Sequence, residues 1–137
     1  VFTLDNDTND NENTAEHIAY AFHSVEGYSK IGTYTANGSA DGPFVYTGFR
    51  PQYVLVKGSS LISEWYVWDA VRNTYNVTNL TLNPNQLVAE YSGGALLLDL
   101  TANGFKLRDA VGSWNLSGNT YIFMAFAETP FKYSNAR

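Results

Sequence analysis

The chain of 137 residues contains no cysteine, one methionine and few charged side chains. Without cysteine it can form neither a disulfide framework nor a metal site with thiolate ligands. It also contains no apolar run near the roughly 20 residues that a membrane-spanning helix needs, and no basic amphipathic segment. We therefore expect a single domain that depends on its own core or on oligomerisation, with no membrane insertion.

Positive charge is scarce as well. The net charge is −5, and the eight Lys and Arg residues are scattered singly along the chain. Binding to nucleic acid needs clusters of these residues against the phosphate backbone. The composition therefore argues against a nucleic-acid partner.

Aromatic residues are abundant at 15%, with ten Tyr and eight Phe, and this composition favours strands over helices. Alternating or continuous apolar segments are separated by Gly and Asn turns at intervals of about ten residues, a pattern typical of a β-sandwich or barrel. The sequence predicts an all-β fold, an antiparallel β-sandwich of jelly-roll or lectin-like type with little or no helix. The expected strands are residues 18–22, 30–35, 44–46, 53–57, 65–69, 96–102, 105–107 and 121–128.

Local signals refine this prediction. Asn103-Gly104 marks the clearest hairpin, and the continuously apolar segment 53–57 indicates a central strand covered on both faces. Trp65 and Trp68 are predicted to lie on one face of their strand. A single helical turn is expected where Pro84 follows the capping residue Asn83.

An internal repeat affects the domain boundaries. The segments 2–4 and 18–22 resemble 105–107 and 122–126 in pattern and spacing. We therefore expect residues 1–17 to be the end of an upstream repeat unit with an acidic, Asn-rich loop, and residues 18–137 to form the sandwich module. The acidic loop lacks the Gly and the terminal Glu of a calcium-binding loop, so a solvated loop is expected around Asp5, Asp7 and Asp10.

The residues that commonly carry chemistry form no recognisable constellation. A catalytic histidine needs a nucleophile beside it, and the sequence contains no nucleophile-elbow motif that could provide one for His17 or His23. A glycosidase would need two paired carboxylates, and sequence alone does not pair any of those available. The prediction is a protein that is not an enzyme, with no catalytic residues, no metal and no cofactor. The carboxylates considered are Glu26, Glu64, Asp69, Glu90, Asp99, Asp109 and Glu128.

Five residues are singled out as candidates. Arg50, Asp69 and Arg72 are predicted to form structural ion pairs that fix a turn against a strand. Trp114 and Asn115 lie in a polar stretch between two strands, where an exposed Trp would be a candidate ligand-binding residue. The alternative is that Trp114 is a plug over the end of the sandwich.

Four strings together resemble a C-terminal β-rich domain of virion proteins from tailed bacteriophages, especially marine phages, found in tail fibres and other structural proteins. They are Phe22–Lys30, Gly48–Pro51, Gly104–Arg108 and Ala125–Tyr133. The resemblance covers nearly the whole chain from Ile18. It implies a lectin-like β-sandwich module exposed on a virus particle, and it carries over no catalytic residue.

The resulting expectation is a virion structural protein, a tail-fibre or capsid-appendage module in an extracellular particle. It would serve host-surface attachment or subunit assembly, as a homo-oligomer that is either a trimer or a strand-exchanged assembly with other virion subunits. Two alternatives remain open. One is a lectin-like module that binds a host-surface glycan, and the other is a polysaccharide depolymerase. A likeness of fold to lectins does not by itself establish sugar binding.

Overall fold

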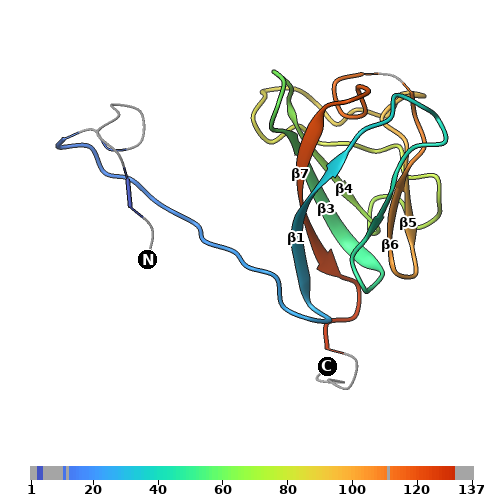
Figure 1. Ribbon diagram of the computed structural model, residues 1–137, viewed down its shortest axis with the longest axis horizontal. Helices are drawn as coiled ribbons and strands as arrows, with labels where there is room; N and C mark the ends of the chain where they lie inside the picture. The colour runs from blue at the N-terminus through green and yellow to red at the C-terminus, as the bar shows by residue number, and fades with distance from the viewer. Residues whose placement is uncertain (1–2, 5–10, 12, 111, 132–137) are drawn as a thin grey trace.

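The computed structural model describes residues 3–4, 11, 13–110 and 112–131. Within those residues every regular element is a β-strand (Figure 1), which confirms the predicted all-β class. The described part of the chain therefore offers no helix that could cross a membrane. The strands are β1 (Ser29–Thr35), β2 (Phe44–Tyr46), β3 (Pro51–Gly58), β4 (Trp65–Asp69), β5 (Leu98–Thr101), β6 (Gly104–Leu107) and β7 (Thr120–Ala127).

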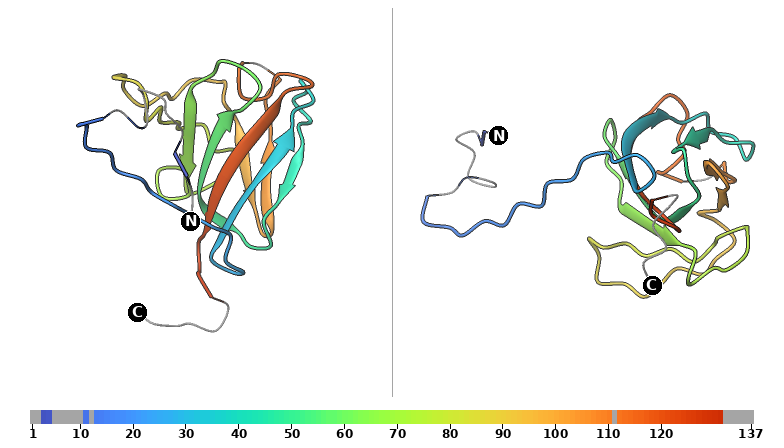
Figure 2. Two further views of the ribbon diagram at one scale, coloured as in Figure 1. Left: turned by 60° about the vertical axis from the view of Figure 1, so that its left-hand side comes forward. Right: turned by 90° about the horizontal axis from the view of Figure 1, so that it is seen from below.

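The strands form two antiparallel sheets that face each other across one core (Figure 2). Sheet A has the order β1-β7-β3-β4, and sheet B has the order β2-β6-β5. The continuously apolar β3 lies between β7 and β4, so its prediction as a central strand is confirmed. We call the two sheets and their connections the body.

Alternate residues of each strand point into the core, as the period of two requires. Tyr34 of β1 and Tyr121 of β7 are directly opposite each other, and their rings stack with centroids 5.1 Å apart. Phe105 of β6 approaches Phe123 from the other sheet edge-on at 5.4 Å. Aromatic rings therefore form a large part of the core, although most of the Tyr and Phe residues that the structure describes lie partly or fully exposed outside it.

One side of the body is closed by the connection between β4 and β5. Leu82 exchanges main-chain hydrogen bonds with Val67 at the edge of sheet A, and Thr78 does the same with Leu98 at the edge of sheet B. The side-chain amide of Asn76 continues the second edge by bonding both the N–H and the C=O of Leu100 at 2.9 Å. These contacts satisfy edges that would otherwise be open to pairing with another strand.

Close approach of the chain explains two glycines. A Cβ atom at Gly104 would lie 2.2 Å from the carbonyl oxygen of Val45, and one at Gly42 would lie 2.6 Å from atoms of Leu107. Only a residue without a side chain fits at either position. Glycine at these two positions allows β2 and the segment before it to lie close against β6.

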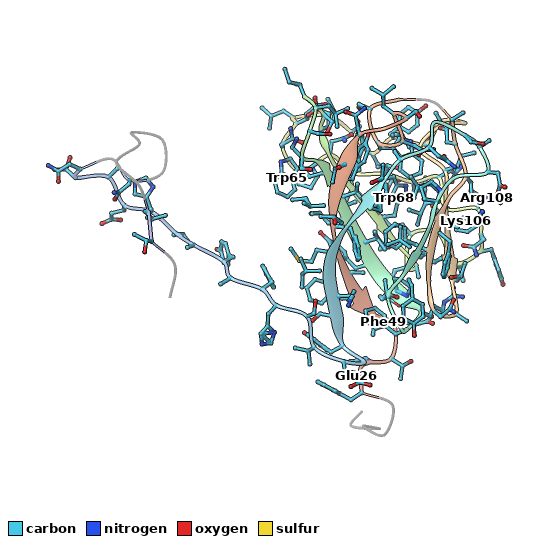
Figure 3. The ribbon with its side chains drawn as sticks, viewed as in Figure 1. Glu26, Phe49, Trp65, Trp68, Lys106 and Arg108 are labelled. Atoms are coloured by element: carbon cyan, nitrogen blue, oxygen red, sulfur yellow. The ribbon has the colours of Figure 1, made fainter. Side chains whose placement is uncertain are left out.

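Three local predictions are wrong. Residues 18–22 are not a strand, because no segment among the described residues pairs with them. Trp65 and Trp68 lie on opposite faces, since residues three apart in a strand cannot share one; Trp68 is fully buried, whereas Trp65 lies on the outer side (Figure 3). The segment after Asn83 is a turn closed by the N–H of Gln86 bonding to the Asn83 carbonyl, not a helical turn.

The repeat prediction for residues 1–17 and the acidic loop fall mostly outside the described residues. The structure gives no account of Asp5, Asp7 or Asp10.

Candidate functional site

Trp114 and Asn115 lie together in the connection between β6 and β7, and both are fully buried. The Trp114 ring centroid lies 5.0 Å from that of Trp68, and the Tyr34 hydroxyl donates a hydrogen bond of 2.9 Å to the Trp114 carbonyl. The prediction that Trp114 is exposed, on which its role as a ligand-binding candidate depended, is therefore wrong. The connection folds over the end of the core and buries the Trp114 indole there. Trp114 therefore closes the end of the sandwich, as the alternative prediction had it.

Asn115 has a structural role as well. Its side-chain nitrogen donates to the carbonyl oxygens of Ser39 at 2.9 Å and Asp109 at 2.7 Å, and its side-chain oxygen accepts from the N–H of Asn37 at 3.3 Å. A buried amide with these partners is satisfied and leaves no group for a ligand. It ties the connection after β1 to the connection after β6.

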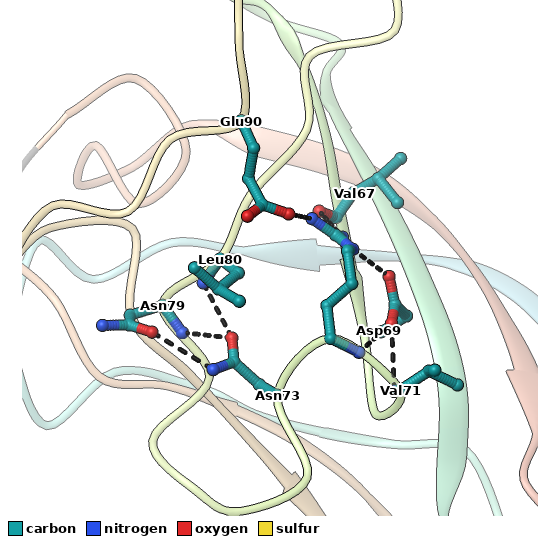
Figure 4. Close-up of polar contacts among 8 residues, drawn as sticks. Val67, Asp69, Val71, Asn73, Asn79, Leu80 and Glu90 are labelled. Atoms are coloured by element: carbon teal, nitrogen blue, oxygen red, sulfur yellow. Dashed lines mark hydrogen bonds and ion pairs between the residues drawn. The ribbon is translucent and has the colours of Figure 1, made fainter.

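The predicted ion pair of Asp69 with Arg72 is present and extends further (Figure 4). Arg72 Nε lies 2.5 Å from Asp69 Oδ2, and Arg72 Nη1 lies 2.6 Å from Glu90 Oε2. A third hydrogen bond runs from Arg72 Nη2 to the Val67 carbonyl at 3.2 Å. The guanidinium thereby ties Glu90, in the later part of the long connection between β4 and β5, to the start of that connection and to β4.

The ionisation of Asp69 argues for this structural role. Partial burial acts to raise the pKa of its carboxyl, but the hydrogen bonds and charge of Arg72 outweigh it, so the pKa lies below its ordinary value. A glycosidase needs one carboxyl with a raised pKa to act as the acid. Since Asp69 and Glu90 both bind one guanidinium, their arrangement favours two anions that hold a cation.

Arg50 pairs with a residue that sequence reasoning did not assign to it. Its Nε lies 2.9 Å from Glu128 Oε2 at the end of β7, without hydrogen-bond geometry, and both side chains are more than a third exposed. The pair joins the start of β3 to the end of its neighbour β7, close to the hydrogen bond from the Glu128 N–H to the Arg50 carbonyl. An exposed pair of this kind contributes little to stability, about 0–1 kcal/mol.

Among the residues that the structure describes, the histidines do not come together with acidic side chains into a metal site. His17 lies on the segment before the body, and the main-chain carbonyl of His23 accepts a hydrogen bond from Ser29 Oγ at 2.9 Å. Within the described ranges, no group of three or more His, Asp and Glu side chains is placed to hold a metal ion.

The most unusual feature is the segment of residues 13–22, which we call the arm. Residues 23–28 connect it to the lower end of β1, and it runs away from the body in an extended conformation (Figures 1 and 2). Ile18 and Tyr20 are each 80% exposed. Large apolar side chains that project into solvent from an extended segment are typical of a chain that binds another surface.

The base of the arm touches an apolar surface. Phe22 packs edge-on against Phe126 of β7 with ring centroids 6.0 Å apart. Together with Tyr53, Leu55 and Met124 these two residues line an open, mostly apolar groove of about 390 Å³ on the outer face of sheet A. This face is the side of sheet A that points away from the core, and its partly exposed apolar side chains are Ile31, Tyr53, Leu55, Ile122, Met124 and Phe126.

Sequence reasoning missed this face, although a signal for it exists. In β3 and β7 both sets of alternate residues are largely apolar, and for the segment 53–57 this pattern predicts cover on both faces. The structure buries Val54 and Val56 completely but leaves Leu55 and Met124 partly exposed. A second apolar face on a strand can indicate either a second layer or a surface for a partner.

Comparison with known proteins adds a family. A family model described as a domain of unknown function, DUF7483, matches residues 1–130. The matched range includes the arm and the body. No curated protein and no solved structure matches the chain. The chain therefore belongs to the DUF7483 family of domains.

Proposed function

We propose that this chain is a structural module of a virus particle, part of a tail fibre or capsid appendage, and that it joins subunits to one another. The observation that carries this proposal is the arm, with Ile18 and Tyr20 each 80% exposed. Leaving apolar surface in water costs about 25 cal/mol per Å², so an arm of this composition is stabilised by a partner that covers it. Placement in an extracellular phage particle rests on the resemblance of the four sequence strings.

The partner that this composition favours is another copy of the chain, in a trimer or a strand-exchanged assembly. The same molecule carries both an exposed apolar arm and an exposed apolar outer face on sheet A. Homo-oligomers form readily when a chain supplies both surfaces. The charged network around Arg72 has a different task, since its groups already bind one another.

Light scattering over a range of dilutions tests the proposal. We expect the chain to form an oligomer, and the double variant Ile18→Ser/Tyr20→Ser to be a folded monomer. The matched control is Ile62→Ser/Tyr75→Ser, because these residues are at least as exposed but lie in connections of the body. The control should still assemble. A wild-type chain that stays monomeric at every concentration would show that the proposal is wrong.

A second candidate function is binding of a host-surface glycan, and one observation favours it. Phe44 and Tyr46 of β2 are both exposed on the outer face of sheet B, two residues apart on a rigid strand. Aromatic side chains with this spacing can stack on sugar rings. A glycan array should detect binding that Tyr46→Ala removes and the control Tyr75→Ala keeps, since Tyr75 is more exposed but lies in a connection of the body. No binding to any glycan would leave assembly as the sole function proposed.

A further inference from the structure

The edge of sheet A at β1 is partly open. Main-chain hydrogen bonds run from the Ala127 N–H to the Tyr28 carbonyl and from the Ala36 N–H to the Asn119 carbonyl. In an antiparallel pair only alternate residues bond across, so the even-numbered residues of β1 face β7. The odd-numbered residues turn their N–H and C=O groups toward the other side.

The first half of this edge is already occupied by the chain itself. Val25 and Ser29 exchange main-chain hydrogen bonds across a turn. Ser24 Oγ then accepts from the N–H of Ile31 at 2.9 Å and donates to its carbonyl at 3.3 Å. The Ser24 side chain therefore makes the two hydrogen bonds to Ile31 that the main chain of a neighbouring strand would otherwise make.

The second half of the edge is free. Thr33 and Thr35 are both exposed, and among the described residues their outward main-chain groups have no hydrogen-bond partner. The edges of β4 and β5 on the other side of the body are covered by the segment 76–82. No described segment pairs with the edge of β2 either, but that strand has only three residues. The free part of β1 is therefore the best position for an added strand.

The arm of the same molecule does not reach this position. To pair with Thr33 it would have to continue along β1 from Val25. Instead the chain leaves the sheet at Ser24, and Phe22 turns onto the outer face against Phe126. Folding back would break both contacts, so the strand that completes the edge comes from elsewhere.

We propose that residues 18–21 of a second copy add to the β1 edge at Thr33 and Thr35 as an extra strand. Main-chain hydrogen bonds supply the pairing, and alternate side chains supply the selectivity. Ile18 and Tyr20 face the apolar outer side of sheet A, where Ile31 of β1 lies beside Met124 of β7. The small Ala19 and Ala21 face the other way. This inference rests on the proposed assembly function and names the surface through which the assembly forms.

Because the chain has no cysteine, paired substitutions can test the contact directly. Chains carrying Tyr20→Cys are mixed with chains carrying Thr33→Cys and oxidised, because both side chains lie on the outer face of sheet A in the proposed pairing. Mixed disulfides are counted by mass spectrometry. We expect at least tenfold more of this pair than in a control with Ala102→Cys, an exposed position at the tip of the β5–β6 hairpin. Equal yields would overturn the inference. So would a disulfide within one chain of the dilute double variant Tyr20→Cys/Thr33→Cys.

A second variant tests the edge without cross-linking. Thr33→Pro removes only an N–H that faces away from β7, a position where an edge strand tolerates proline. We expect a folded chain whose self-association is at least tenfold weaker, whereas the control Thr33→Val keeps wild-type association. If Thr33→Pro does not fold, the disulfide yields decide.

The two proposals fail in different ways. Association that persists in Thr33→Pro but is lost in Ile18→Ser/Tyr20→Ser would retain the assembly function and place the arm on another surface. A wild-type chain that never associates would overturn the assembly function itself.

Discussion

At the scale of single residues, the burial of Trp114 decides how the end of the core is sealed. Replacing it with Ala should remove about 3–5 kcal/mol of the free energy of unfolding, as for other fully buried aromatic residues. The control is Trp65→Ala, which removes a partly exposed indole. It should lower the free energy of unfolding by only about 1 kcal/mol. Urea unfolding followed by far-ultraviolet circular dichroism measures both. Similar losses for the two variants would contradict the plug.

Asp69 gives a prediction on pH. Its pKa is lower in the folded chain, where Arg72 outweighs the effect of burial. Its contribution to stability is therefore complete above its unfolded pKa of about 3.9 and is lost as the pH falls through the lower folded value. Between pH 5 and 2 the wild type should lose more stability than Asp69→Asn, measured by urea unfolding. Parallel curves would show that the pair with Arg72 contributes nothing.

At the scale of elements, Asn76 imitates a strand at the edge of β5. Its side-chain amide bonds both main-chain groups of Leu100, so Asn76→Ala should leave the Leu100 N–H facing water. Loss of about 1 kcal/mol of hydrogen-bond energy predicts roughly fivefold faster amide exchange at Leu100. The amide of Leu98, which bonds to the main chain of Thr78, is the internal control and should be unaffected. Unchanged exchange at Leu100 would show that another group protects it.

The strands could be predicted from sequence because their signals are local. Phe44–Tyr46 and Trp65–Asp69 were predicted with the bounds they have in the structure, since Gly, Pro or Asn turns lie close to both. The segment 18–22 has the same alternation, and yet it is not a strand. Alternation gives a segment the ability to pair, whereas a strand also needs an edge to bond with, and that depends on the rest of the fold.

The candidate site was harder to predict, for a related reason. A polar stretch around Trp114 looks like a surface loop, because sequence does not show that the loop folds back over the core. The partner of Arg50 is Glu128, far away in sequence, and no local pattern joins them. Arg72 and Asp69 could be paired because they lie three residues apart. Short-range geometry was therefore accessible, and long-range contacts were not.

At the scale of the whole molecule, the two sides of the body differ. The β4 and β5 edges are covered by the chain's own connection, whereas no segment that the structure describes pairs with Thr33 and Thr35 at the edge of β1. Unlimited edge-to-edge stacking of sheets is a hazard for β proteins. A single short free stretch, from Gly32 to Thr35 at most, limits the length of any strand that can be added at that edge.

The arm and the β1 edge are also different surfaces, so a contact between them is head to tail. Such contacts close into rings or continue as filaments with two unlike ends. A Thr33→Pro subunit would still donate its arm but would offer no edge to the next copy. In a growing filament it would act as a chain terminator at one end, while Ile18→Ser/Tyr20→Ser subunits would terminate the opposite end. A small fraction of either variant should therefore shorten filaments, whereas a closed ring, once formed, would exclude both.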